Sequence, residues 1–146
     1  MTPLLLTSFT ERIYRASGVH LLRSYMRHVH DIPLLVFTEG SILGDRLESH
    51  PGISTYDLDT SAFLKDWLQA NHDIIPEDLG GAAVPCNCPQ PDDPFGIHKG
   101  GCHWAWFNKN ASRWFRKIAA LHHAASFPAG FDALVWIDSD CRFLRS

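Results

Sequence analysis

Apolar positions along the chain fall into short runs and into helical spacings, and the short runs predict the strands. Mainly apolar runs occur at 4–9 ("LLLTSF") and 32–40 ("IPLLVFTEG"), and a weaker one occurs at 53–59 ("ISTYDLD"). A fourth, at 132–138 ("DALVWID"), has no charge between its first and last residues. Runs of this length, rich in Leu, Val, Ile and Phe, are typical of strands buried on both faces.

Three other segments have the spacing of helices. In 14–29 and in 59–72, apolar residues recur every three or four positions, and Asp59, Thr60 or Ser61 can cap the second of these helices. The segment 110–126 has one apolar face, made by Trp114, Ile118, Leu121 and Ala125. Between the last two helices, residues from about 74 to 107 are rich in proline and glycine and predict an irregular insertion.

The order of these elements predicts the fold class. Strands that alternate with helices and look buried on both faces indicate an α/β protein with a mostly parallel sheet flanked by helices. The length of 146 residues suits a single domain, residues 1–146, that contains the irregular insertion.

Composition and charge exclude some partners and leave others open. The hydrophobic fraction of 45% is that of a globular core, and the net charge of −3 comes with interspersed charges and no basic stripe. Nucleic acid is therefore a poor candidate partner. The apolar start is too short for a signal peptide, and no run reaches membrane-spanning length, so we expect a cytoplasmic protein without a transmembrane segment.

The end of the last predicted strand carries the chemistry that most needs explaining. Asp138 and Asp140 follow an apolar run, and charged side chains near a core are rare unless they are paired or bind a metal. If extension continues past Ile137, alternation points both carboxylates the same way. Mg²⁺ and Mn²⁺ favour oxygen ligands, usually one or two carboxylates with phosphate oxygens. A divalent cation that holds a sugar-nucleotide diphosphate is the interpretation we favour.

An apolar strand followed by Asp-x-Asp resembles the metal-binding motif of glycosyltransferases with the A-type fold. "LLLTSFTERIYRASG" resembles the first strand and helix start of several bacterial and viral members, and "SRWFRKIAALHHAA" is similar to the helix before their motif strand. The resemblance covers about residues 4–40 and 108–145. It implies a Rossmann-like nucleotide-diphospho-sugar transferase fold and transfer of a sugar from a nucleotide donor to a glycan, lipid or protein acceptor.

The resemblance also implies roles for individual residues. Asp140 is expected to be the direct ligand of Mn²⁺ or Mg²⁺, and Asp138 to contact the ribose, or the metal through water. Four further residues are expected near the nucleotide or its diphosphate: Thr7, Ser8, Arg113 and Lys117.

Members of this family continue well beyond the motif, whereas this chain stops at Ser146. The later half of such domains supplies the acceptor site and, in inverting members, the catalytic base. The expectation is therefore that the fold is truncated after the motif or that the missing half comes from elsewhere. This chain would then supply the donor-binding half, and no catalytic base is assigned.

Each of these assignments has a plainer alternative. Asp138 can simply cap the next turn, and the Arg113 and Lys117 side chains can belong to a solvated helix face. A rival Asp-x-Asp occurs at Asp57 and Asp59, where the strand is poorer and Asp59 suits a helix cap.

The irregular insertion contains enough sulfur and imidazole for a structural zinc site. Its Cys-x-Cys spacing is not that of the usual zinc knuckle, so a disulfide or free thiols remain alternatives. The candidate ligands are Cys86, Cys88, His98, Cys102 and His103.

Two other functional classes remain open. A phosphatase of the haloacid-dehalogenase type also places Asp-x-Asp after an apolar strand, with the first carboxylate as nucleophile. A non-catalytic binding module stabilised by zinc would instead rely on residues 86–103.

Overall fold

The computed structural model describes residues 2–40, 51–71, 103–127 and 130–144. The chain divides into two compact units, one made of residues 1–61 and 117–146 and the other of residues 62–116. The first unit contains the sheet and the acidic pair Asp138 and Asp140.

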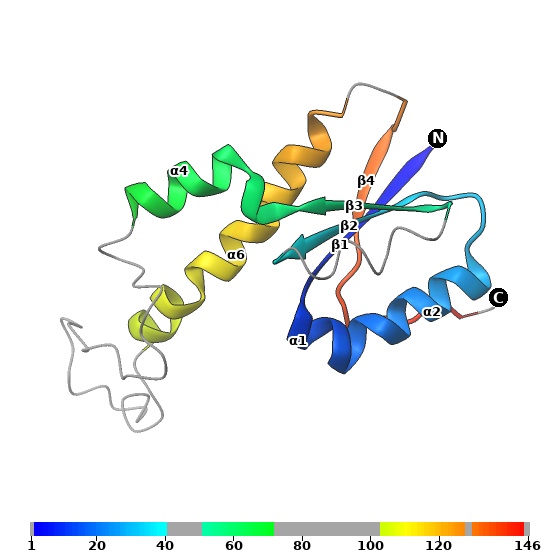
Figure 1. Ribbon diagram of the computed structural model, residues 1–146, viewed down its shortest axis with the longest axis horizontal. Helices are drawn as coiled ribbons and strands as arrows, with labels where there is room; N and C mark the ends of the chain where they lie inside the picture. The colour runs from blue at the N-terminus through cyan, green and yellow to red at the C-terminus, as the bar shows by residue number, and fades with distance from the viewer. Residues whose placement is uncertain (1, 41–50, 72–102, 128–129, 145–146) are drawn as a thin grey trace. The chain divides into compact units, whose positions relative to one another are not determined.

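Four parallel strands form one sheet in the first unit (Figure 1). They are β1 (Pro3–Thr10), β2 (Leu34–Glu39), β3 (Ile53–Asp57) and β4 (Ala133–Trp136), in the order β3-β2-β1-β4. The register pairs Leu5 of β1 with Leu34 of β2. Each strand lies where an apolar run predicted it, and the predicted α/β class with a parallel sheet flanked by helices is confirmed.

The helical segment after β1 covers one face of this sheet. It consists of α1 (Glu11–Ile13), the π-helical stretch η1 (Tyr14–Gly18) and α2 (Val19–His28). The helix predicted over 14–29 therefore begins three residues earlier and includes a π-helical turn. Its apolar side chains form a core with β1, β2 and β3, and the α2 residues in that core are Leu21, Leu22 and Tyr25.

The part of α6 (His103–Ala125) that belongs to the first unit packs on the opposite face. His123 stacks on Tyr56 of β3, with ring centroids 3.6 Å apart, and meets Phe37 of β2 edge-on at 5.9 Å. Phe37 and its neighbour Val36 are both buried, and Val36 belongs to the core on the α2 side, as the alternation of side chains along a strand requires. Three small residues of α6 are buried: Ala119, Ala120 and Ala124.

The start of α6 differs from the sequence prediction. The helix was expected over 110–126, but it begins at His103, so residues 103–107 are helical and not irregular. Residues 74–102 of the predicted insertion lie outside the described residues.

The strand β4 also differs from its prediction. It was expected over 132–138 and buried on both faces, but it spans four residues, Ala133–Trp136, at one edge of the sheet. Leu134 is 36% exposed and Val135, on the other face, is 38% exposed. The expectation of burial is wrong because β4 has a described neighbour, β1, on one side only, and an edge strand is covered less completely than a central one.

The second unit contains α4 (Ala62–Ala70) and the preceding part of α6. Trp67 of α4 stacks on Phe115, with ring centroids 3.9 Å apart and planes inclined by 8°. Phe63, one turn earlier on α4, stacks on the same ring at 5.3 Å. Offset and stacked aromatic pairs of this kind stabilise helix packing by about 0.5–1.5 kcal/mol each beyond the buried area.

Candidate functional site

The strand order of the first unit reverses at β1. From β1 the chain adds β2 and β3 on one side, and it returns on the other side with β4. In open parallel sheets, ligands bind at the carboxyl ends of the strands where the order reverses. This position lies between the ends of β1 and β4, at Thr10 and Trp136, and Asp138 and Asp140 follow directly.

The backbone turns as soon as β4 ends. The Ile137 amide still donates to the Leu6 carbonyl of β1, at 2.8 Å, but the Cys141 amide then donates to the Asp138 carbonyl, at 3.0 Å. Asp138 and Asp140 are therefore the first and third residues of a β-turn. The extended chain that the alternation argument assumed past Ile137 is not present, so the turn determines where the two carboxylates point.

Asp138 is held by two donors that meet at one carboxylate oxygen. The Lys117 ammonium of α6 lies 3.0 Å from Oδ1, and the indole N–H of Trp136 donates to the same atom at 2.8 Å. The Lys117 nitrogen also lies 4.8 Å from the centroid of the Trp136 ring, within cation–π range. Within the described part of the chain, the other oxygen, Oδ2, has no hydrogen-bond partner.

These contacts fix the charge of Asp138. The hydrogen bond from Lys117, then that from Trp136, lowers the pKa of the carboxyl below its ordinary value, and the charge of Lys117 acts in the same direction. Partial burial raises the pKa but is outweighed. Because the Asp138 side chain is 66% exposed and Lys117 44% exposed, the ion pair contributes little to stability. Asp138 is thus an ionised carboxylate that solvent and ligands can reach.

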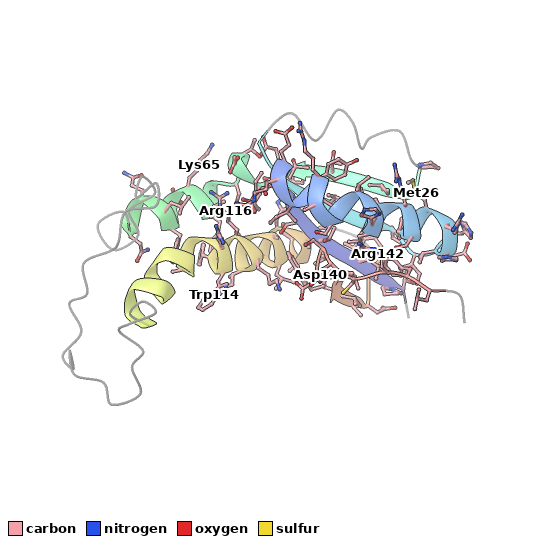
Figure 2. The ribbon with its side chains drawn as sticks, turned by 90° about the horizontal axis from the view of Figure 1, so that it is seen from below. Met26, Lys65, Trp114, Arg116, Asp140 and Arg142 are labelled. Carbon is pink, nitrogen blue, oxygen red and sulfur yellow. The ribbon has the colours of Figure 1, made fainter. Side chains whose placement is uncertain are left out.

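Asp140 is exposed, and the hydrogen bonds around it are made to backbone carbonyls and not to its carboxylate. The Arg142 guanidinium donates to two backbone carbonyls, that of Asp140 at 3.3 Å and that of Cys141 at 2.6 Å. Among the described residues, none donates a hydrogen bond to the Asp140 carboxylate. Figure 2 shows Asp140 and Arg142 close together beyond the end of β4. No described residue therefore prevents a ligand from binding either carboxylate oxygen of Asp140.

The opposite side of the switch point is formed by the end of β1 and the π-helical stretch. The Thr10 side chain accepts a hydrogen bond from the Ile13 amide at 3.2 Å and caps the helix start. Ser17 of η1 lies with its Oγ 3.4 Å from the Oγ of Ser139, the middle residue of the acidic motif. This contact joins η1 to the turn after β4, and π-helical turns often occur at functional sites.

The structure places Thr7 and Ser8 on different faces of β1. Thr7 pairs in register with Val36, on the α2 side, and is fully buried; its hydroxyl has no hydrogen-bond partner among the described residues. The register pairs Leu6 with Trp136, so alternation along β1 puts Ser8 on the same face of the sheet as Trp136, whose ring Lys117 meets. Ser8 therefore belongs to the Trp136 face, whereas Thr7 faces the core.

The other predicted site residues belong to the second unit or lie outside the described residues. Arg113 is exposed on α6 in the second unit. Cys86, Cys88, His98 and Cys102 lie outside the described residues, as does the side chain of His103, so the zinc interpretation stays a prediction. Within the described ranges, no group of three or more His, Cys, Asp or Glu side chains is placed to hold a metal ion.

The rival acidic pair at the end of β3 has structural partners. Asp57 Oδ1 accepts a hydrogen bond from the Asp59 amide at 3.0 Å and caps the short helix η2 (Leu58–Thr60). Asp59 Oδ2 accepts from the Gly40 amide at 2.9 Å. Asp57 therefore caps η2, which precedes α4, and both acidic side chains bind backbone amides.

Trp136 and Arg142 are site residues that the sequence analysis did not identify. Trp136 precedes Asp138 by two residues on a predicted strand, so the predicted alternation would have put the two side chains on the same face. No comparable sequence signal indicates that Arg142 binds the carbonyls of the turn.

The residues at the switch point fit a hard divalent cation in one respect. Mg²⁺ is usually bound by one or two carboxylates together with phosphate oxygens and water, and not by a full cage of protein ligands. Asp140 and Oδ2 of Asp138 can supply two such oxygens. A cation with a bound diphosphate suits this site, and a cation held by protein alone does not.

Searches against protein-family models, curated proteins and solved structures found no match. The fold and the site therefore define the chain only as an α/β protein with an all-parallel sheet and an acidic turn at its switch point. Of the helices described, none is both long enough and apolar enough to cross a membrane.

Proposed function

We propose that this chain is the donor-binding part of a metal-dependent glycosyltransferase with the A-type fold. The parallel sheet, the reversal of strand order at β1 and the acidic turn after β4 support this proposal. The observation that carries it is the position of Asp138 and Asp140 at the switch point, because this is where α/β sheets bind ligands.

In the proposed site, Asp140 is the direct ligand of Mn²⁺ or Mg²⁺, and Asp138 binds the ribose or a water on the cation. Lys117, which contacts Asp138, and Ser8, on the Trp136 face of β1, are proposed to contribute to the diphosphate pocket. The cation supplies positive charge that stabilises the departing nucleoside diphosphate without proton transfer. The chain itself orients the donor through these side chains, and we assign it no catalytic base.

Thr7 and Arg113 are given no role in this proposed pocket. Thr7 faces the core on the α2 side, and Arg113 belongs to the second unit. Their expected contacts with the nucleotide stay predictions from the family resemblance.

A thermal-shift panel tests the proposal. UDP, GDP, ADP and CDP are each added with and without Mn²⁺, and we expect at least one to stabilise the protein in the presence of the metal by more than the sum of the two separate shifts. The Asp140→Ala variant should keep the melting temperature of the wild type and lose this synergy. Asp66→Ala removes an exposed carboxylate from α4 and is the matched control.

The outcomes of that panel also separate the rival functions. If no nucleoside diphosphate stabilises the protein with metal present, the glycosyltransferase proposal is wrong. The phosphatase predicts turnover of p-nitrophenyl phosphate that Asp138→Asn abolishes. The zinc module predicts one equivalent of zinc in the purified protein, and unfolding when a chelator removes it.

A further inference from the structure

Lys117 already neutralises Asp138, the carboxylate beside which the proposed cation would bind. Its ammonium lies 3.0 Å from Oδ1, on a flexible side chain from α6, and no other basic side chain in the described part of the chain contacts this carboxylate. A lysine ammonium is a compact point charge, so it neutralises a carboxylate much as a small metal ion does. The metal-free site is thus already partly neutralised.

The two donors at Oδ1 differ in what the arrival of a cation would do to them. The Trp136 indole N–H is uncharged, and its ring lies on the short strand β4, so it can keep its 2.8 Å hydrogen bond. Lys117 carries a full positive charge, and like charges this close repel each other strongly. The ammonium must therefore withdraw as the charge of the cation builds up beside Asp138.

A lysine that withdraws from Asp138 has a suitable new partner in the proposed donor. Its side chain is 44% exposed, and its nitrogen lies 4.8 Å from the centroid of the Trp136 ring, beside the site. A diphosphate that arrives with the cation brings several anionic oxygens to the same place. Charge-assisted hydrogen bonds from lysine to phosphate oxygens are about twice as strong as neutral ones.

We propose that Lys117 is an exchangeable counter-ion: its ammonium holds Asp138 before the cation binds and moves to the donor diphosphate afterwards. This inference rests on the proposed function. It makes Lys117 a positioning residue with opposite effects on the two ligands, since it competes with the cation and assists the diphosphate. A lysine that merely stabilised the fold would affect the two ligands in the same direction or not at all.

Binding measurements on Lys117→Met test this exchange. Methionine keeps an unbranched apolar stem over Trp136 and removes the charge. Mn²⁺ affinity is measured first without nucleotide, from the loss of the electron paramagnetic resonance signal of free Mn²⁺. We expect Lys117→Met to bind Mn²⁺ about fivefold more tightly than the wild type, which corresponds to about 1 kcal/mol for the lost ion pair.

The second measurement is the affinity for the nucleoside diphosphate that stabilises the wild type best, by calorimetry at saturating Mn²⁺. Here we expect Lys117→Met to bind roughly tenfold more weakly, because one charge-assisted contact is lost. Lys117→Arg retains the charge and should restore both affinities toward the wild type. Lys65→Met removes a lysine charge from α4 in the other unit and should change neither.

The results separate this inference from the proposed function. Unchanged or weaker Mn²⁺ binding by folded Lys117→Met overturns the competition, and unchanged nucleotide binding overturns the transfer to the diphosphate. If the wild type binds no nucleoside diphosphate with Mn²⁺, the proposed function fails instead. In that case the nucleotide-free measurement still decides whether Lys117 competes with a cation at Asp138.

Discussion

Replacing Gly18 by alanine should destabilise the first unit through a single contact. A Cβ atom on Gly18 would lie 2.7 Å from Cε1 and 2.8 Å from Cδ1 of Phe9 on β1. The Phe9 ring is fully buried and cannot move into solvent, so its neighbours must shift. Overpacking of this kind costs about 1–3 kcal/mol, and the better helix propensity of alanine offsets up to about 1 kcal/mol. We expect a net loss of about 1–2 kcal/mol.

Urea unfolding followed by circular dichroism measures this loss. The midpoint should fall with an unchanged slope, and the melting temperature should drop by roughly 2–8 °C for a chain of this size. Phe9→Leu replaces the aromatic ring by a smaller side chain, so Gly18→Ala should cost much less in that background, in a double-mutant cycle. Equal stability of Gly18→Ala and the wild type would refute the argument that a Cβ atom at Gly18 overpacks against Phe9.

Two further predictions concern titration. Burial, then the neighbouring His122, lowers the pKa of His123, so the unfolded state takes up a proton more readily than the folded state. The stabilisation from neutral His123 should therefore be complete above the unfolded histidine pKa of about 6.5 and be lost as the pH drops through the lowered folded value. Between pH 7.5 and 5, the melting temperature of His123→Phe should fall less than that of the wild type. An identical fall would contradict the assignment. Trp136→Phe keeps an aromatic ring under Lys117 but removes the N–H donor, so the pKa of Asp138 should rise toward its ordinary value. Carboxyl-carbon NMR titration measures that pKa, and an unchanged value would mean that the indole does not stabilise the carboxylate.

Apolar runs predicted the strands well because a buried strand needs a short stretch of mostly apolar side chains, and such a stretch is visible in the local sequence. They did not predict where in the sheet each strand lies. The run that became β4 is as apolar as those of central strands, yet Leu134 and Val135 are exposed because β4 is at the edge. Position in a sheet depends on contacts distant in sequence, and apolar content does not encode it.

The helix α6 shows a similar limit. Its sequence marks Trp114 and Ile118 as part of an apolar face, but both are exposed in the structure. The buried residues of its C-terminal half are alanines, whose small side chains let the helix approach the sheet closely. Large apolar side chains dominate a periodicity argument, so a face made of Ala119, Ala120 and Ala124 is easily missed.

At the candidate site, the sequence predicted which residues take part better than it predicted how they are arranged. It indicated Asp138, Asp140 and Lys117, but it assumed that the strand continued through the motif. Asp and Ser are favoured turn residues, and the turn closed by the Cys141 amide follows from that local chemistry. The contact between Lys117 and Asp138 joins residues 21 positions apart, so only the fold shows that they are partners.

The most direct test of the acidic turn as a cation and diphosphate site is a crystal grown with Mn²⁺ and the nucleoside diphosphate that stabilises the protein best. Manganese anomalous scattering locates the ion independently of any assumption about its ligands. The account predicts a peak in contact with the Asp140 carboxylate, near Oδ2 of Asp138, and with phosphate oxygens on its other side. A manganese ion and nucleotide bound elsewhere, with Asp138 still held by Lys117, would contradict it.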